Sequence, residues 1–244
     1  MDRSADFDDT PDAGRRKAIG TLGALGVAGF LAPALADAAT PPRAVGCTLI
    51  AQETAGPFPL LEALSNRAIV RRDITEGRSG VPLALQLSLV DVARGCAPIA
   101  GAAVYVWHCD REGAYSGYEG RGDASVARQT FLRGVQVSDA AGRVRFDTIY
   151  PGWYPGRVTH VHVQVYLHDD LRGRAMATSQ LAFPDDVTRA VYASPLYAAH
   201  GQNTSVRRVV DDFAFADGAV TQMLDVTGSA AEGYRAVLAM GVSA

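Results

Sequence analysis

The sequence predicts an all-β protein, specifically an antiparallel β-sandwich with few short helices. Apolar and polar residues alternate strictly over residues 83–89 and again over 160–167, which indicates strands with one buried face. β-branched and aromatic residues over 102–108 indicate a third strand. Short strands separated by Gly- and Pro-containing turns, with one modest helical segment over 184–199, favour a sandwich over a mixed α/β fold.

The rest of the predicted domain follows the same pattern. Residues 135–137 and 144–146 flank a turn-forming segment, which predicts a β-hairpin. Further strands are expected near 176–183 and at 234–238, whereas the Gly-, Ser- and charge-rich residues after position 110 predict a loop. We expect residues 47–244 to form a single domain, which is long enough to bury a full core.

Residues 1–38 have the features of an export signal, and a polar linker follows over 39–46. A charged Arg-Arg-Lys segment at 15–17 precedes an Ala/Gly/Leu-rich stretch, and small residues over 34–38 offer cleavage sites. The paired arginines favour the twin-arginine route, but their surroundings depart from its consensus and leave Sec export open. The rival interpretation, an uncleaved membrane anchor, is disfavoured by a short apolar stretch that contains Pro33. We expect a periplasmic or extracellular protein without stable membrane association after cleavage.

The three cysteines agree with an oxidising compartment. There, one pair can form a disulfide and leave an odd thiol. We expect Cys47 to pair with Cys96, which would tie the start of the mature chain to the loop before the strand at 102–108. Three buried free thiols, Cys109 included, remain the alternative at this stage.

The composition is that of an ordinary globular protein, with 48% hydrophobic and 20% charged residues. The formal net charge of −3 argues against a nucleic-acid partner, because such surfaces are normally strongly basic. The sequence does not determine the oligomeric state.

A His-x-His pair stands out in the strand at 160–167. His160 and His162 point to the same face, so that they can converge on one ion while the intervening valines enter a core. The pair alone is weak evidence, since a solvated or hydrogen-bonded strand face is the more common reason for such a pair. Two tyrosines strengthen it, Tyr154 six residues earlier and Tyr115 on the preceding loop. Phenolate oxygen is a hard donor that suits a highly charged ion such as ferric iron, because only a strong Lewis acid keeps a phenol deprotonated at neutral pH.

With these residues the sequence resembles the intradiol ring-cleavage dioxygenases, non-haem iron enzymes that open catechols between their two hydroxyls. Several spaced motifs together make the likeness more specific than any one of them. The residues that carry the likeness are Trp107-His108-Cys109-Asp110, Gly113-Ala114-Tyr115-Ser116, the segment from Tyr150 to Pro155, Arg157, His160 and His162, with the segments 52–58 and 178–184 on either side.

The resemblance implies one ferric iron, Fe(3+), per chain, with Tyr115 and His160 as equatorial ligands and Tyr154 and His162 as axial ligands. It implies that a catechol binds as a dianion in place of Tyr154, that O2 attacks the ring, and that a muconate-type diacid results. It further implies that Arg157 and Gln180 lie over the ring, where Arg157 stabilises developing negative charge. Gly56, Pro57 and Trp153 are expected to line the substrate pocket.

Two other functions remain open from the sequence. One is an exported β-sandwich binding module that has lost catalysis, and the other is a copper or zinc protein that uses His160 and His162. His108 is expected to be structural, and His168 and His200 to lie on the surface. Cys109 has no partners for a nucleophilic triad.

Overall fold

The computed structural model describes residues 47–65, 67–118, 124–167, 171 and 173–244. These residues belong to one compact unit, Thr40–Ala244. The predicted export signal and linker lie outside the described residues. Within the described part of the chain, no helix is both long enough and apolar enough to cross a membrane.

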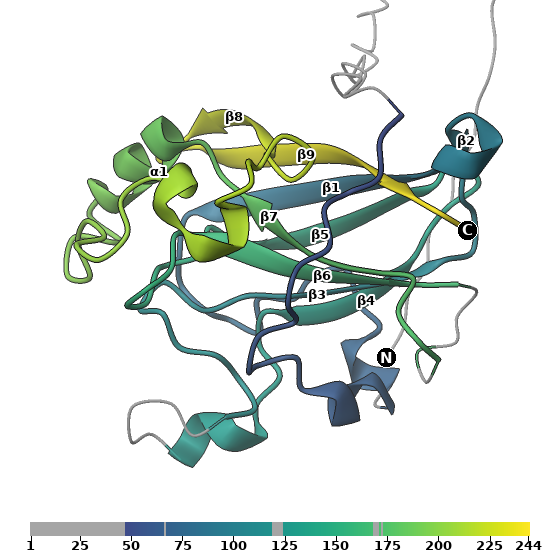
Figure 1. The fold of residues 1–244 in the computed structure, drawn as a ribbon. Helices are drawn as coiled ribbons and strands as arrows, with labels where there is room; N and C mark the ends of the chain where they lie inside the picture. The colour runs from purple at the N-terminus through teal and green to yellow at the C-terminus, as the bar shows by residue number, and fades with distance from the viewer. Residues whose placement is uncertain (1–46, 66, 119–123, 168–170, 172) are drawn as a thin grey trace, which may run out of the picture. The chain divides into compact units, whose positions relative to one another are not determined.

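The alternating segment at 83–89 forms the centre of the first of two stacked sheets (Figure 1). Its leucines are buried on one face, whereas Ala84, Gln86 and Ser88 lie on the other and are less buried. This strand, β1, pairs with β5 on one side and with β9 on the other. The strands of this sheet are β1 (Pro82–Asp91), β2 (Ala97–Pro98), β5 (Arg143–Ile149), β8 (Asp225–Ser229) and β9 (Gly233–Val242).

The alternating segment at 160–167 forms β6, a central strand of the second sheet. β6 pairs antiparallel with β3 and with β7, and this register places His162 opposite Trp107 on one side and opposite Gln180 on the other. The strands of this sheet, in spatial order, are β4 (Arg133–Val137), β3 (Ala103–Trp107), β6 (His160–Tyr166) and β7 (Ala177–Ala182).

The main core lies between the two sheets. Leu85 and Leu87 of β1 and Leu238 of β9 belong to the same buried cluster as Val106 of β3 and Val163 of β6. Burial of a side chain of this size stabilises the fold by about 1.5–3 kcal/mol. Because strand side chains alternate faces, the valines of β6 turn its histidines away from this core.

Helical segments are short and lie outside the two sheets. In Figure 1, α1 lies at one end of the first sheet, with β2 and the C-terminus at its other end. The helices of the described residues are α1 (Asp185–Tyr192) and the 3-10 helices η1 (Leu61–Ser65), η2 (Arg67–Ile69), η3 (Val92–Arg94), η4 (Ala124–Arg128), η5 (Val209–Asp211) and η6 (Phe213–Phe215).

The predicted all-β sandwich is confirmed, with one exception to its antiparallel pairing. β1 and β9 run parallel over Leu83–Asp91, while the other pairs of named strands in the described residues are antiparallel. β9 lies near the end of the chain, far from β1 in sequence. The long segment between them allows β9 to run either parallel or antiparallel to β1.

The predicted hairpin over 135–146 is wrong. The turn forms, with the N–H of Gly142 donating to the carbonyl of Asp139 at 2.8 Å, but the strands on either side belong to different sheets. β4 pairs with β3, and β5 pairs with β1. The turn is therefore a crossing from one layer to the other, and periodicity alone cannot separate a crossing from a hairpin.

A disulfide joins Cys47 to Cys96, whose Cα atoms lie 5.7 Å apart. Cys109 is a buried free thiol. Beyond Cys47 the chain runs beside the end of β9, where the N–H of Ile50 donates to the carbonyl of Gly241 at 2.8 Å. The disulfide thus closes one end of the first sheet, next to the turn before β2.

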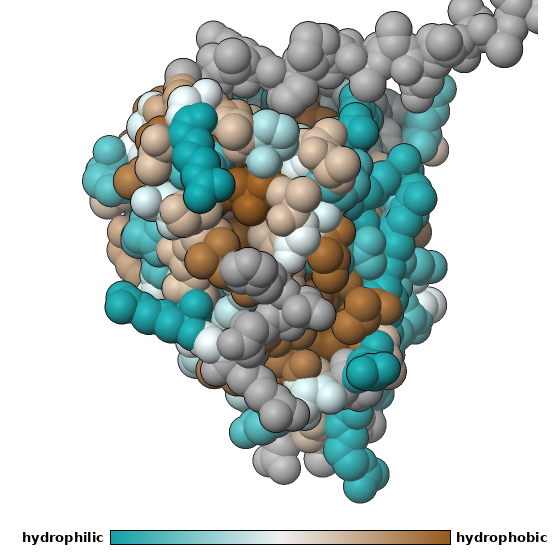
Figure 2. Space-filling model, turned by 90° about the vertical axis from the view of Figure 1, so that its right-hand side faces the viewer, coloured by the Kyte–Doolittle hydropathy of each residue, from teal (hydrophilic) through white to brown (hydrophobic). Residues whose placement is uncertain are grey.

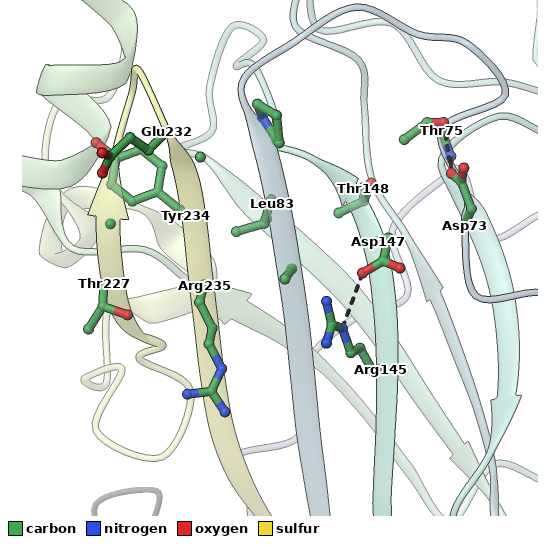
Figure 3. A pocket seen from close by; sticks show the side chains of 14 residues that line it. Asp73, Thr75, Leu83, Arg145, Asp147, Thr148, Thr227, Glu232, Tyr234 and Arg235 are labelled. Carbon is green, nitrogen blue, oxygen red and sulfur yellow. Dashed lines mark hydrogen bonds and ion pairs between the residues drawn. The ribbon is translucent and has the colours of Figure 1, made fainter. Parts of the chain in front are cut away.

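Two grooves lie away from the predicted histidine pair. One of about 600 Å³ crosses the first sheet and is lined by charged and hydroxyl side chains, among which Arg145 and Asp147 pair with each other (Figure 3). The other, of about 300 Å³, lies by β2 and includes Ile99 and Leu167. Figure 2 views that end and shows hydrophobic residues at the surface among hydrophilic ones.

Candidate metal centre

The outer face of the second sheet carries His160 and His162, and other parts of the chain cover it. Both histidines are at most 2% exposed. Tyr105 and Trp107 of β3 share this face and form a second apolar cluster with segments from both sides of the sequence, including Phe58 and Tyr115. The sheet face that carries the two histidines is therefore largely buried.

The orientation of His160 is fixed by the backbone. Its Nδ1 lies 2.7 Å from the carbonyl oxygen of Val158. A carbonyl only accepts hydrogen bonds, so Nδ1 carries the hydrogen and Nε2 presents a lone pair. Burial lowers the pKa of His160 to about 3, with the nearby Arg157 guanidinium acting in the same direction. His160 is therefore a neutral imidazole whose Nε2 can donate its lone pair.

His162 points its Nε2 toward the same place. The Nε2 atoms of His160 and His162 lie 3.1 Å apart. Burial, followed by the neighbouring His160, holds the pKa of His162 well below its usual range, so this ring is neutral too. Its Nδ1 is buried and has no hydrogen-bond partner among the described residues.

The two predicted tyrosines reach the same nitrogen from separate loops. The hydroxyl of Tyr154 lies 3.2 Å from His160 Nε2, and that of Tyr115 lies 3.4 Å from it. The Tyr115 loop is held by Asp110, whose Oδ1 accepts the N–H of Ala114 at 2.9 Å. Phe58 stacks on the Tyr115 ring with centroids 4.6 Å apart.

Both phenols are protonated unless a strong cation is near. Burial raises the pKa of Tyr115 well above 10, and proximity to Cys109 and Tyr154 adds to the effect. Burial also raises the pKa of Tyr154 to about 12, against the opposing effect of Arg157. Phenolate ligands at this place therefore require a strong Lewis acid, such as a trivalent metal ion.

The residues present fit such an ion. Two neutral imidazole nitrogens and two phenol oxygens meet around one point, and without a cation the facing Nε2 atoms could share only a single hydrogen. Within the described ranges, no three His, Cys, Asp or Glu side chains gather in a way that could hold a metal. A metal at this site would thus need the tyrosines, which favours a hard ion over zinc or copper.

Arg157 and Gln180 lie beside the four donors. Arg157 Nη1 is 3.4 Å from His160 Nε2, and Arg157 Nη2 donates to Gln180 Oε1 at 2.5 Å. Gln180 Nε2 in turn donates to the carbonyl of Thr54 at 2.9 Å. The structure therefore brings together all six residues predicted as ligands or catalytic groups: Tyr115, Tyr154, Arg157, His160, His162 and Gln180.

The predicted pocket residues divide into two groups. Gly56 lies against the site, since a Cβ built there would be 3.4 Å from His162 Cε1. Pro57 is exposed next to it. Trp153 instead packs on His200, with ring centroids 4.7 Å apart, and donates from Nε1 to the carbonyl of Gly201. Among the described contacts, none joins the Trp153 ring to the four donors.

Sequence reasoning missed a buried carboxylate at the site. Asp212 is 1% exposed, and both its oxygens lie within 3.1 Å of Arg157 Nε. The contact spans 55 positions of sequence. No periodicity or spacing marks Asp212, so only the fold reveals this pair.

The structure shows the surroundings of two of the remaining histidines, His108 and His200. His108 is buried and structural, with Nδ1 2.7 Å from the carbonyl of Cys109 and Nε2 2.8 Å from the hydroxyl of Thr148. The surface position expected for His200 is wrong, because it is half-buried and its Nε2 lies 2.7 Å from the carbonyl of Trp153. His168 lies outside the described residues.

Burial raises the pKa of Cys109 far above its usual range, which leaves it an inert thiol.

Comparisons with known proteins point to one family. The family model described as Dioxygenase matches residues 55–202, a range that contains Tyr115, Tyr154, His160 and His162. The protocatechuate 3,4-dioxygenase beta chain of Burkholderia cepacia is 30% identical over 125 residues, 47% of this chain and 52% of that protein. The chain thus spans about half the length of the curated relative it matches.

Solved structures agree. An intradiol ring-cleavage dioxygenase from Tetranychus urticae is 26% identical, with a TM-score of 0.69 over 81% of this chain and 95% of its own. A dioxygenase domain from Streptomyces sp. SirexAA-E shares the fold at 23% identity, with a TM-score of 0.56 over 80% of this chain and 99% of its own. Catechol and protocatechuate dioxygenases of this type are non-haem iron oxidoreductases. The Dioxygenase model covers more than half of the chain, and we conclude that the chain belongs to the intradiol ring-cleavage dioxygenase family.

Proposed function

We propose that this chain is an intradiol ring-cleaving dioxygenase, which inserts O2 into a catechol-type diol to give a muconate-type diacid. One ferric iron per chain would be held by Tyr115, Tyr154, His160 and His162. The observation that carries the proposal is the convergence of two phenol oxygens and a second imidazole nitrogen within 3.4 Å of His160 Nε2. A bound ferric iron would draw electron density from the diol and make its ring reactive toward O2.

The two tyrosines suit different tasks. Tyr115 is 4% exposed and stacked on Phe58, so we assign it a permanent place in the site. Tyr154 is only partly buried and lies on the loop before β6, so it is the phenol with room to move. Once displaced from the ion by the diol, the Tyr154 phenolate would be a strong base, because burial raises the pKa of this phenol to about 12. Tyr154 Oη is therefore suited to take a proton from a diol hydroxyl as the diol enters.

Arg157 supplies fixed positive charge at the edge of the site. Its Nη1 faces the four donors, while its other nitrogens are held by Gln180 and Asp212. At a buried position, an oriented N–H group stabilises negative charge that develops on the diol ring more strongly than in solution. Gln180 holds Arg157 and is itself anchored on Thr54, in the irregular segment before Gly56.

We also propose that the protein acts outside the cytoplasm. The Cys47–Cys96 disulfide supports this location, because such bonds persist mainly in oxidising compartments. The Arg-Arg-Lys segment and the apolar stretch near the start of the sequence support export. Catecholic compounds that occur outside the cell would then be the substrates.

Oxygen uptake tests the proposed activity. The iron-loaded protein is mixed with catechol, protocatechuate or hydroxyquinol, and the product mass is measured. We expect stoichiometric O2 consumption with at least one diol and a product that contains the diol plus both oxygen atoms. An iron-loaded protein that binds diols and consumes no O2 is a binding module, and this result would reject the proposal.

A further inference from the structure

Arg157 is anchored by a carboxylate that lies outside the family-model match. Its side chain is 8% exposed, and that of its ion-pair partner, Asp212, is fully buried. Arg157 Nε lies 3.1 Å from Oδ1 and 3.0 Å from Oδ2 of this aspartate. The Dioxygenase model ends at residue 202, ten positions before Asp212.

The three guanidinium nitrogens of Arg157 face three different partners. Nε faces Asp212, and Nη2 donates to Gln180 Oε1. Nη1 is left to face His160 Nε2 at 3.4 Å. Because a guanidinium is planar, fixing its Nε and Nη2 edges also fixes where Nη1 points.

Asp212 is itself held by the backbone. It accepts the N–H of Val158 at 2.7 Å and the N–H of Ala214 at 2.9 Å, the second as the N-cap of η6. Its carboxylate thus connects the start of η6 to the residue that follows Arg157. Asn203 fixes the same loop from another side, because its side-chain amide donates to the carbonyl of Arg157 at 2.8 Å.

The neighbouring aromatic residue covers the guanidinium. The Phe213 ring centroid lies 4.8 Å from Arg157 Cζ, although the Phe213 side chain is exposed. A cation over an aromatic face is stabilised by about 0.5–1 kcal/mol at exposed sites. Asp212 therefore binds the Nε edge of the Arg157 guanidinium, and Phe213 lies against one of its faces. Neither contact occupies the Nη1 edge.

We propose that Asp212 is a positioning residue for the ring-cleavage reaction, acting through Arg157. The inference rests on the proposed function, since it assigns Nη1 of Arg157 to the charge that develops on the diol. Loss of the Asp212 carboxylate leaves the Arg157 guanidinium with Gln180 and the exposed Phe213 ring, and the long side chain can then rotate its N–H groups away from the four donors. A displacement of about 1 Å in such a group can lower a rate by about a hundredfold.

The test compares Asp212→Asn with Asp211→Asn. Asp211 is the adjacent aspartate, but it is exposed and pairs with Arg208 at the surface. Iron content, anaerobic affinity for catechol and steady-state kinetics are measured for both variants. We expect Asp212→Asn to lower kcat about tenfold to a hundredfold, with iron content and catechol affinity retained. Asp211→Asn should match the wild type in all three measurements.

A double-mutant cycle separates positioning from an independent role. If Asp212 acts through Arg157, then Arg157→Gln and Arg157→Gln/Asp212→Asn should have the same kcat within about a factor of two. Multiplicative effects of the two substitutions would overturn the proposal. So would a wild-type kcat for Asp212→Asn, or a loss of kcat that only follows a loss of iron.

Asp212 also caps η6, so a second variant addresses folding. Asp212→Ser keeps an acceptor for the N–H of Ala214 and removes the partner of Arg157. It should show the same loss of kcat as Asp212→Asn. If neither variant folds, Asp212 is a stabilising residue and the proposal is rejected. A wild-type protein that consumes no O2 with any diol rejects the proposed function instead, which keeps the two failures distinct.

Discussion

The indole ring of Trp107 lies parallel to the imidazole ring of His162, with centroids 4.8 Å apart and an angle of 4° between the planes. This contact matters because His162 Nδ1 has no hydrogen-bond partner among the described residues. A metal-binding histidine usually donates its second N–H to a carbonyl, a carboxylate or water. His160 follows that rule through Val158, whereas the orientation of His162 depends on packing.

Replacing Trp107 by Leu should therefore weaken iron binding. We expect a loss of about tenfold to a hundredfold in iron affinity, the range found when support around a ligand is removed. Trp107→Phe keeps an aromatic ring on His162 and should retain most of the affinity. Trp153→Leu is the matched control, since Trp153 packs on His200. Iron titration of all three variants, with thermal melting to confirm folding, checks this prediction, and equal affinities would contradict it.

Gly56 lies next to the same ring. It adopts φ of +64°, in the left-handed region, and a Cβ there would be 3.4 Å from His162 Cε1. Gly56→Val should cost about 1–2 kcal/mol through backbone strain and also displace His162, so that iron binding weakens. Gly156 has φ of +91° and no atom within 4 Å of its built Cβ. Gly156→Val should therefore lose stability and keep iron, and equal iron loss in the two variants would argue against the contact.

The Cys47–Cys96 disulfide should contribute substantially to stability. It links residues 49 apart in sequence. In the chain-entropy model, a loop of that length stabilises the fold by about 4 kcal/mol. Cys47→Ser should lower the melting temperature and remove its dependence on reductant. Cys109→Ala affects the buried free thiol and should leave the dependence on reductant in place. A wild-type melting temperature that reductant does not change would contradict the prediction.

His108 should make stability fall in mild acid. Burial lowers the pKa of His108 to about 4, whereas an unfolded histidine has a pKa of about 6.5. As pH falls below about 6.5, the unfolded state takes up a proton before the folded state does, so stability is lost down to about pH 4 and is fully present above pH 6.5. The loss from this residue is at most about 3 kcal/mol. Chemical denaturation from pH 7 to pH 4 should show a shallower pH dependence in His108→Gln than in the wild type, and identical slopes would refute the assignment.

Alternation in the sequence was sufficient to place the histidines and the core. Val161, Val163 and Val165 enter the core between the sheets, so His160 and His162 must share the opposite face. The tyrosines could be joined to that face only through the resemblance to the dioxygenases, because nothing local in the sequence shows that two loops fold over a sheet. Burial of the opposite face of β6 likewise depends on segments that come from elsewhere in the chain and not on the strand itself.

Contacts between distant segments could not be predicted. Asp212 reaches Arg157 across 55 positions, and β9 joins β1 in parallel from the end of the chain. The turn at 138–142 was predicted at the correct place, but its flanking strands join different sheets. Periodicity reports which face of a strand is buried, while the partner of a strand depends on the whole topology.

The visible spectrum of the iron-loaded protein tests the central claim most directly. Phenolates on ferric iron absorb visible light, so the protein with one ferric iron per chain should be wine-red, and its band should shift when catechol is added without oxygen. Tyr154→Phe should keep iron, with an altered band and slower catechol binding, while Tyr150→Phe, which changes a core tyrosine, should leave the spectrum unchanged. A colourless protein that nevertheless contains one ferric iron per chain would show that Tyr115 and Tyr154 are not its ligands.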